Sequence, residues 1–217
     1  MNIEQARFNM IEQQIRPWNV LDAQVLHLLA VVKREDFVPP AHKALAFADM
    51  EIPLGYGETM LAPRVEARLL QDAAVRKHEK VLEIGAGSGY LTALLAHQAQ
   101  RVIALEIDAD LVKMARANLQ KAGIHNADVR QFDGAVGAAA EAPFDLIVLG
   151  GSVAEVPQNL LAQIKVGGRL IGLVGEDPVM CATLITRVNE TEFKTRTLWD
   201  CAAPALQNFP VPSHFQF

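Results

Sequence analysis

One ten-residue segment constrains the fold more than any other part of this 217-residue chain. It reads Val81-Leu82-Glu83-Ile84-Gly85-Ala86-Gly87-Ser88-Gly89-Tyr90, so a short apolar run leads into a glycine at every second position. The apolar run predicts a buried strand over 80–84, and the residues that follow predict a helix over 90–98. Glycines allow a ligand to approach the backbone closely, and the start of a helix offers unpaired amides to an anion. The segment therefore predicts an α/β fold with a ligand site at this crossover.

The same alternation of strand and helix continues along the chain. The expected strands are 80–84, 101–105, 128–132, 144–149 and 169–174, and the expected helices are 90–98, 108–122 and 157–164. Short apolar strands separated by helices are typical of right-handed crossovers and of a parallel sheet covered on both faces. We therefore predict an α/β fold with a Rossmann-like, doubly wound, mostly parallel sheet.

The section before this core is predicted to be mostly helical. One helix, capped by Asn2, is expected to run to about Ile15, where Arg16-Pro17 ends it. Asp22 is expected to cap a second helix and Pro63 to begin a third, with a glycine-rich loop over 55–59 between them.

The section after the core changes period. Residues 182–188 and 193–199 alternate between apolar and polar, which predicts an antiparallel hairpin at the sheet edge. The tail beyond Asp200 is rich in proline and phenylalanine and is expected to be extended and held by its rings. We expect one domain, made of an N-terminal helical section (1–76), a ligand-binding core (77–175) and a C-terminal hairpin and tail (176–217).

Composition argues against several classes of protein. The net charge of −5 predicts no broad phosphate-binding surface and hence no nucleic-acid partner. No stretch approaches the roughly 20 apolar residues that span a bilayer, and the N-terminal residues lack the pattern of a secretion signal. Cys181 and Cys201 form no Cys-x-x-Cys unit, which favours a reduced, cytoplasmic protein. The six histidines have no ligand-like spacing, so no metal site is expected.

The glycine pattern also discriminates between ligands. A dinucleotide fingerprint that starts at Gly85 needs a small third residue where Tyr90 stands, which disfavours an NAD-dependent oxidoreductase. The order Glu-x-Gly-x-Gly-x-Gly resembles that of class I S-adenosylmethionine-dependent methyltransferases. The resemblance implies that Glu83 lies near the methionine amino group of the cofactor. The loop residues that it assigns to cofactor binding are Gly85, Ala86, Gly87, Ser88 and Gly89.

Two further carboxylates follow the next two strands. Glu106, followed by Ile107, comes 21 residues after Gly85 (106 − 85), near the roughly 20 expected for a carboxylate that accepts from a ribose diol. Asp133, followed by Gly134, is implied by the resemblance to be the adenine partner. Each could instead be a solvated strand end or a turn residue, and the glycine loop only a tight connection. Together they fit one ligand across the carboxyl ends of the strands.

A narrower resemblance covers residues 5–175. The chain resembles protein-L-isoaspartate O-methyltransferases in several short motifs: 13–16 (Gln-Gln-Ile-Arg), Asp22 with Val25 and Leu26, 34–39 (Arg-Glu-Asp-Phe-Val-Pro), 55–59 (Gly-Tyr-Gly-Glu-Thr), 143–145 (Pro-Phe-Asp) and 166–170 (Val-Gly-Gly-Arg-Leu). The resemblance implies methyl transfer to the carboxylate of an isoaspartyl residue in a damaged protein. A carboxylate is already ionised at neutral pH, so this reaction needs positioning rather than a general base.

The expected acceptor loop departs from the family pattern Gly-His-Gly-Gln-Thr-Ile-Ser-x-Pro. Thr59 is retained, but Leu61 stands at the serine position and Glu58 at the glutamine position. Leu61 offers no hydrogen bond, and an inward Glu58 would repel an anionic acceptor. The three residues are the candidates for the catalytic side of the site. The alternative is that Glu58 faces solvent and Leu61 merely packs.

Two other functions stay open at this point. One is methyl transfer to a less anionic small molecule, for which Tyr56 or Glu58 is the candidate general base. The other is a cofactor-binding module without catalysis, with the tail as a contact segment. The sequence does not decide the oligomeric state.

Overall fold

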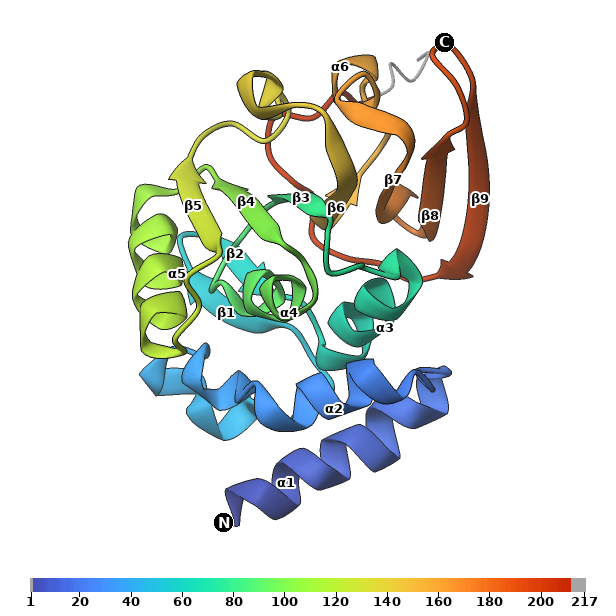
Figure 1. Ribbon diagram of the computed structural model, residues 1–217. Coiled ribbons are helices and arrows are strands. Elements are labelled where there is room, and N and C mark those ends of the chain that lie inside the picture. Colours follow the sequence, from blue (N-terminus) through green and yellow to red (C-terminus); the bar gives the residue numbers. More distant parts are fainter. Residues whose placement is uncertain (1, 212–217) are drawn as a thin grey trace, which may run out of the picture.

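A computed structural model describes residues 2–211, and it has one seven-stranded sheet in the order β5-β4-β3-β6-β7-β8-β9 (Figure 1). The strands are β3 (Lys80–Ile84), β4 (Arg101–Glu106), β5 (Ala127–Gln131), β6 (Phe144–Val153), β7 (Ile164–Glu176), β8 (Val179–Arg187) and β9 (Phe193–Asp200). The first five pair in parallel, and β8 and β9 are antiparallel. The predicted Rossmann-like fold and the C-terminal hairpin are confirmed.

Alternate residues of each inner strand pack on opposite faces of the sheet. Val81 joins the core under α3 (Pro63–Ala73), α4 (Tyr90–Gln98) and α5 (Ala109–Lys121), whereas Leu82 joins the core under α6 (Gln158–Leu161). This period of two, with helices over both faces, is why the strands are apolar throughout. In Figure 1, α3 and α4 lie below the strands and α6 lies above them.

The N-terminal section packs below α3 and α4 (Figure 1). It contains α1 (Ile3–Met10), the π-helical turn η1 (Ile11–Ile15), α2 (Ala23–Val31) and the 3₁₀ turns η2 (Arg16–Trp18), η3 (Arg34–Asp36) and η4 (Pro40–Leu45). Asn2 and Asp22 cap their helices as predicted. The prediction that the first helix runs to about Ile15 agrees with α1 and η1, which end there; at Arg16-Pro17 the chain changes to the 3₁₀ turn η2, which ends at Asn19 with a φ of +62°.

The predicted loop over 55–59 is instead the turn of a small hairpin. The strands β1 (Ile52–Gly55) and β2 (Glu58–Met60) are antiparallel, and Tyr56 and Gly57 both have positive φ, of +57° and +82°. Two positive φ values are what a tight hairpin turn requires, so the glycines mark a turn rather than an open loop. This hairpin carries Glu58 and Thr59 towards the sheet.

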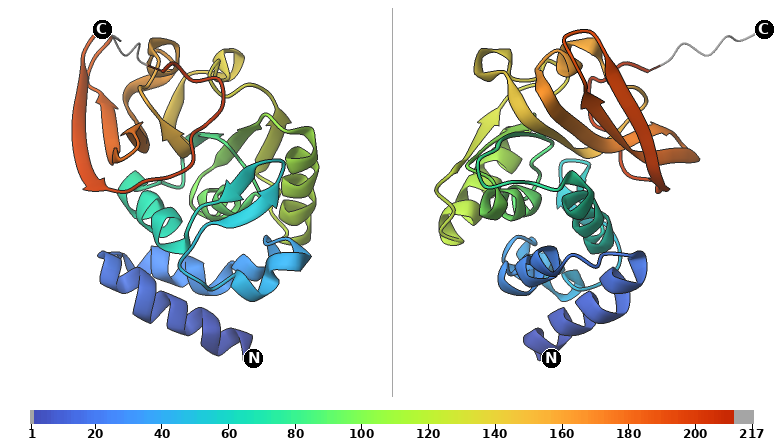
Figure 2. Two further views of the ribbon diagram at one scale, coloured as in Figure 1. Left: turned by 180° about the vertical axis from the view of Figure 1, so that it is seen from behind. Right: turned by 45° about the vertical axis from the view of Figure 1, so that its right-hand side comes forward.

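The tail after β9 turns back across the strand ends. In the left view of Figure 2 it crosses in front of the sheet, near the β1–β2 hairpin. Ser152 on β6 forms an isolated bridge with Ala205, and Phe209 is buried with the core under α6. The prediction that aromatic rings hold the tail is therefore confirmed for Phe209. Phe215 and Phe217 lie outside the described residues.

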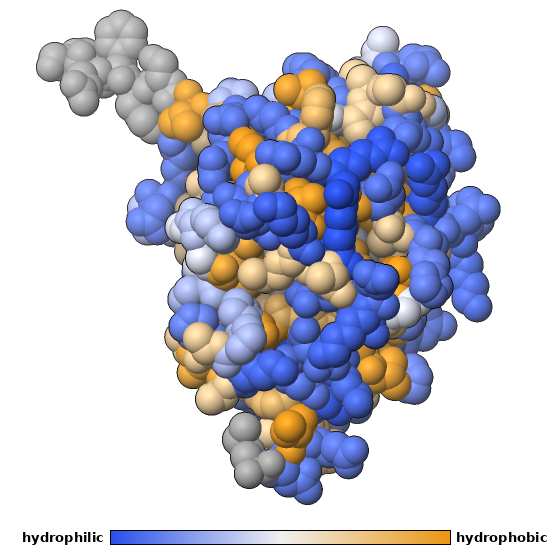
Figure 3. All heavy atoms as spheres, turned by 90° about the vertical axis from the view of Figure 1, so that its left-hand side faces the viewer, coloured by the Kyte–Doolittle hydropathy of each residue, from blue (hydrophilic) through white to orange (hydrophobic). Residues whose placement is uncertain are grey.

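On the side that faces the viewer in Figure 3, apolar groups are interspersed among hydrophilic ones. Among residues 2–211, no helix has the length and apolar character needed to cross a bilayer. Within the same range, no group of three histidine, cysteine or acidic residues could hold a metal ion.

Candidate functional site

The glycine loop, residues 85–89, joins β3 to α4, and hydrogen bonds within the protein hold it in place. The amides of Gly85 and Ala86 donate to Leu105 O at 2.8 and 3.1 Å, which fastens the loop to the end of β4. Gly85 has a φ of +85°, and a Cβ there would lie 2.7 Å from Leu206 Cδ2. The absence of a side chain at Gly85 therefore lets Leu206 of the tail pack directly on the main chain of the loop. Ser88 is buried, and its carbonyl accepts from Asn118 Nδ2 on α5 at 2.9 Å.

Glu83 is a buried carboxylate without a partner. It is 0% exposed, and neither carboxylate oxygen accepts a hydrogen bond within residues 2–211. Burial raises the pKa of Glu83 to about 8, and the charges of Glu66 and Glu106 add to the rise. The Thr92 hydroxyl moderates the rise, although its geometry is not that of a hydrogen bond. A nearby cation would favour the ionised form of Glu83.

Glu106 connects the end of β4 to the glycine loop. Its Oε2 accepts from the Gly87 amide at 2.8 Å, and its Oε1 accepts from the Asp108 amide at 3.1 Å. Burial raises the pKa of Glu106, the backbone amides oppose that rise, and the charge of Glu58 adds to it. The carboxylate is thus held in place and still has lone pairs for a ligand hydroxyl.

Asp133 lies after β5 in a short turn. Its Oδ1 accepts from the Ala135 amide at 2.9 Å, and its Oδ2 accepts from Asn208 Nδ2 at 2.9 Å. A side chain at Gly134 would collide with Ile84, so the turn packs directly on the end of β3. Asp108 caps α5 by accepting from the Asp110 and Leu111 amides, which separates its role from that of Glu106.

A cavity of about 40 Å³ brings several of the predicted residues together. Those that line it are Glu58, Gly85, Glu106, Ile107 and Gly134, with Ile84 and Leu105 from the strands and Leu206, Gln207 and Phe209 from the tail. Sequence reasoning missed the three tail residues, because their apolar and polar mixture carries no periodic signal.

A second cavity, of about 20 Å³, lies on the other side of the glycine loop. Its lining includes Thr59, Met60, Leu61, Glu66 and Tyr90, together with loop residues 85–88. The hydroxyls of Thr59 and Tyr90 are buried there without hydrogen-bond partners. Gly85 lines both cavities, so the two lie next to the same residue of the glycine loop.

Leu61 packs rather than reaching into open space. Its side chain is buried, and its carbonyl accepts from Arg34 Nη2 at 2.7 Å. Arg34 is itself fully buried and forms an ion pair with Glu66. Burial raises the pKa of Glu66 to about 7 against the opposing effect of Arg34.

Glu58 is half-buried and lines the first cavity. Its Oε1 accepts from Gln207 Nε2 at 2.6 Å. Tyr56, the other candidate base, is exposed and is not among the residues that line either cavity. Asp110 beside it raises the pKa of Tyr56, so even less of the hydroxyl is in the deprotonated form that a general base needs at neutral pH.

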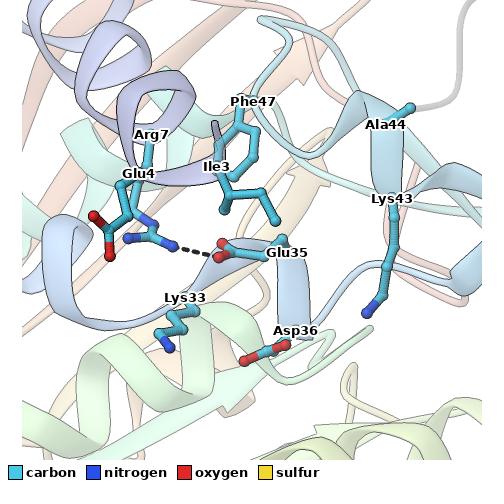
Figure 4. A pocket seen from close by; sticks show the side chains of 9 residues that line it. All are labelled: Ile3, Glu4, Arg7, Lys33, Glu35, Asp36, Lys43, Ala44 and Phe47. Atoms are coloured by element: carbon cyan, nitrogen blue, oxygen red, sulfur yellow. Dashed lines mark hydrogen bonds and ion pairs between the residues drawn. The ribbon is translucent and has the colours of Figure 1, made fainter. Parts of the chain in front are cut away.

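The largest of the described cavities, of about 510 Å³, lies elsewhere. It opens in the N-terminal section between α1 and η3, around the ion pair of Arg7 with Glu35 (Figure 4). Side chains of both charges line it, among them Lys33, Lys43 and Asp36. It shares no residue with the glycine-loop cavities, so the candidate site stays at the strand ends.

Comparison with known proteins gives one consistent result. The family described as Protein-L-isoaspartate(D-aspartate) O-methyltransferase (PCMT) matches residues 5–205. A protein-L-isoaspartate O-methyltransferase from Methanoculleus marisnigri is 39% identical over 182 residues, which are 84% of this chain and 82% of that protein. One from Syntrophobacter fumaroxidans is 40% identical over 176 residues, 81% of this chain and 82% of that protein.

A solved structure shows the same fold. It comes from Plasmodium falciparum and is described as a protein-L-isoaspartate O-methyltransferase in complex with S-adenosyl-L-homocysteine. Its TM-score is 0.78 at 23% identity, and the match covers 95% of this chain and 99% of that one.

Proposed function

Because the chain belongs to the protein-L-isoaspartate(D-aspartate) O-methyltransferase family, we propose that it transfers a methyl group from S-adenosylmethionine to the carboxylate of an isoaspartyl residue in a protein or peptide. The observation that carries the proposal is that Glu106, at the end of β4, accepts from the Gly87 amide and lines one cavity with Gly85 and Gly134, while Glu83 lies near the end of β3 and Asp133 follows β5.

The residues present fit this cofactor. The unpartnered Glu83 suits the methionine ammonium, since the charge would compensate a buried carboxylate. Glu106 suits the ribose hydroxyls, and Asp133 with Gly134 suits the adenine. Gly85 has no side chain, and a Cβ there would lie 2.7 Å from Leu206 Cδ2, so the tail packs directly on the backbone of the glycine loop.

When bound, S-adenosylmethionine supplies a methyl group on a positively charged sulfur, and its transfer to a carboxylate oxygen breaks the carbon–sulfur bond, forms a carbon–oxygen bond and leaves a neutral thioether. The acceptor is ionised at neutral pH, so no side chain of this protein has to remove a proton. The protein has to align the two groups and exclude water. Leu61 and Met60 exclude water on the acceptor side, and the Thr59 hydroxyl is the free donor there.

An isoaspartyl peptide with radiolabelled cofactor tests the proposal. We expect a base-labile methyl ester that forms with the isoaspartyl peptide and not with the same peptide carrying aspartate. Equal background labelling of both peptides, in protein shown by calorimetry to bind the cofactor, would rule out the acceptor while keeping the cofactor site.

A second candidate is a less anionic small-molecule acceptor, favoured by the inward Glu58 and the apolar Met60 and Leu61. Glu58→Gln discriminates between the two candidates. Loss of a repelling charge should lower KM for the isoaspartyl peptide several-fold, whereas loss of a general base should abolish turnover of a neutral acceptor. Glu190→Gln, which removes the same charge on the β8–β9 turn, is the matched control.

A further inference from the structure

Two carboxyl groups are buried together beside the glycine loop. Glu83 on β3 is 0% exposed and Glu66 on α3 is 3% exposed, and Glu66 lines the smaller glycine-loop cavity. Burial raises the pKa of Glu83, and the charge of Glu66 raises it further, so the two groups lie within electrostatic reach of each other. Where water is excluded, two neighbouring ionised carboxylates are costly unless cations compensate both of them.

The cation in this cluster is paired with Glu66. Arg34 is fully buried, forms an ion pair with Glu66 and lies over the Tyr90 ring, 5.1 Å from its centroid. Glu83 has no comparable partner, because neither of its carboxylate oxygens accepts a hydrogen bond within residues 2–211. With both carboxyl groups ionised, one negative charge would therefore be buried without compensation.

The other neighbours of Glu83 in the described part of the chain bring no positive charge. Its partners on the adjacent strands are Ala104 on β4 and Val148 on β6, and both are apolar. From α4 comes the neutral hydroxyl of Thr92, and from the end of β4 comes a further negative charge, that of Glu106. A proton is therefore the compensation that the protein obtains from water when no ligand is bound.

Arg34 determines which of the two carboxyl groups holds the proton. Burial raises the pKa of Glu66 to about 7, and Arg34 opposes that rise. Burial raises the pKa of Glu83 to about 8, and no cation opposes that rise. The pair therefore holds one proton near neutral pH, and the proton lies on Glu83.

We propose that the cofactor ammonium displaces this proton, and that Glu66 is a positioning residue that acts through Glu83 to keep the proton in place until the cofactor binds. On binding, the O–H bond of Glu83 breaks and its proton passes to the solvent. The ammonium keeps its own protons and donates to the carboxylate that remains. Affinity for the cofactor then rises with pH as long as Glu83 is protonated in the free protein. The inference rests on the proposed cofactor site but not on the methyl acceptor.

Infrared difference spectra of the full chain, without and with S-adenosylhomocysteine, test the displacement. The carbonyl stretch of a protonated carboxyl group is separate from the bands of a carboxylate, so at pH 7 we expect one carboxyl band to disappear on binding. Glu83→Gln should lack that band from the start, which assigns it to Glu83. The probe 5′-methylthioadenosine keeps the adenosine and the sulfur but has no ammonium, and it should leave the band in place.

Calorimetry counts the proton. In buffers of different ionisation heat at pH 7, binding of S-adenosylhomocysteine should release about one proton from wild type and none from Glu83→Gln. Between pH 5.5 and 7.0 an α-amino group stays mostly charged, and wild-type affinity should rise by roughly three- to tenfold per pH unit. In Glu83→Gln the affinity should be lower and independent of pH over this range.

Glu66→Gln isolates the contribution of Glu66. It removes the repelling charge, so the Glu83 band of the free protein should titrate at a lower pH than in wild type. Glu79→Gln is the matched control, because Glu79 is equally buried and paired with Arg169 but precedes β3, at the end away from the glycine loop. It should leave the midpoint of the titration unchanged. Glu66→Met with Arg34→Met leaves neither charge buried alone and repeats the measurement if the single variant does not fold.

Two results would overturn the inference. One is a Glu83 band that persists in the complex with S-adenosylhomocysteine, with no proton released. The other is a titration midpoint that neither Glu66 variant lowers. Failure of the proposed cofactor site looks different, since S-adenosylhomocysteine would then give neither binding heat nor any spectral change.

Discussion

Glu83 is the residue whose chemistry depends most on its surroundings. Its sequence pattern implies a place beside the cofactor but not its protonation state, and burial without a hydrogen-bond partner raises the pKa of Glu83 to about 8. The folded protein therefore binds a proton at Glu83 over a pH range in which the unfolded chain has released it.

The first prediction concerns stability against pH. The folded-state pKa of Glu83 is raised from 4.5 to about 8, so its contribution to stability is full below about pH 4.5 and is lost as the pH rises towards 8. Between these pH values, the titration of Glu83 lowers the free energy of unfolding by up to about 1.4 kcal/mol per pH unit. Glu83→Gln should remove this pH dependence. Urea unfolding at pH 5, 6, 7 and 8 measures it. A slope that is the same in both proteins would show that Glu83 does not titrate in this window.

The second prediction concerns Gly85. Gly85→Ala combines a positive φ with a clash against Leu206, so it should weaken binding of S-adenosylhomocysteine by more than tenfold, in line with the roughly 1–3 kcal/mol cost of strained or overpacked sites. Gly167→Ala is the matched control, because Gly167 has a φ of +82° and nothing within 4 Å of its Cβ position. Calorimetry should show unchanged affinity for the control and a loss for Gly85→Ala.

At the scale of elements, the β1–β2 hairpin decides what faces the site. Its turn places Glu58 and Thr59 on a strand that reaches the glycine loop, whereas an open loop would leave both in solvent. The turn contains Tyr56 at a φ of +57°, which is an unfavourable conformation for a bulky residue.

The third prediction follows from that turn. Tyr56→Asn should stabilise the protein by about 0.5–1 kcal/mol, because asparagine tolerates a positive φ and Asn-Gly is the preferred pair for such a turn. The Tyr56 side chain is 63% exposed, so little packing is lost. Tyr56→Ala removes the same side-chain contacts, but alanine does not tolerate a positive φ as asparagine does. It should therefore not raise the free energy of unfolding. Equal unfolding free energies for the two variants would contradict the account.

At the scale of the whole molecule, buried polar contacts join the N-terminal section to the core. Arg34 donates to Ala46 O and Leu61 O and pairs with Glu66 on α3, so one side chain holds three segments beside the acceptor cavity. Farther away, Trp199 Nε1 on β9 donates to Asp72 Oδ2 on α3 at 2.7 Å. Residue contacts on α3 therefore reach both the N-terminal section, through Arg34, and β9, through Trp199.

The fourth prediction tests this joint. Arg34→Met leaves Glu66 buried without its partner and should cost about 3–5 kcal/mol, whereas Arg34→Met with Glu66→Met should cost clearly less. Arg34→Lys keeps the positive charge but loses the planar set of guanidinium donors. Its free energy of unfolding should therefore lie between those of wild type and Arg34→Met. Unfolding free energies at pH 7 provide the comparison. A double variant as unstable as Arg34→Met would mean that packing, not charge, sets the cost.

Local pattern was enough to predict the class of fold, the family and the order of the core elements. The strands 80–84 and 101–105 and the caps Asn2 and Asp22 depend on neighbours a few residues away, and the spacing of Gly85 and Glu106 spans a single strand–helix–strand unit. The prediction of the family is confirmed by the match over residues 5–205. The roles of the individual site residues stay predictions.

Only the tertiary structure decided what surrounds the carboxylates. The contacts of Gln207 with Glu58 and of Asn208 with Asp133 join residues 149 and 75 positions apart, and no periodicity in the tail marks them. The same holds for the burial of Glu83, because a strand pattern predicts an inward side chain but not whether a partner meets it there. Sequence periodicity reports which face a residue occupies, whereas partners across the sheet are set by how distant segments pack.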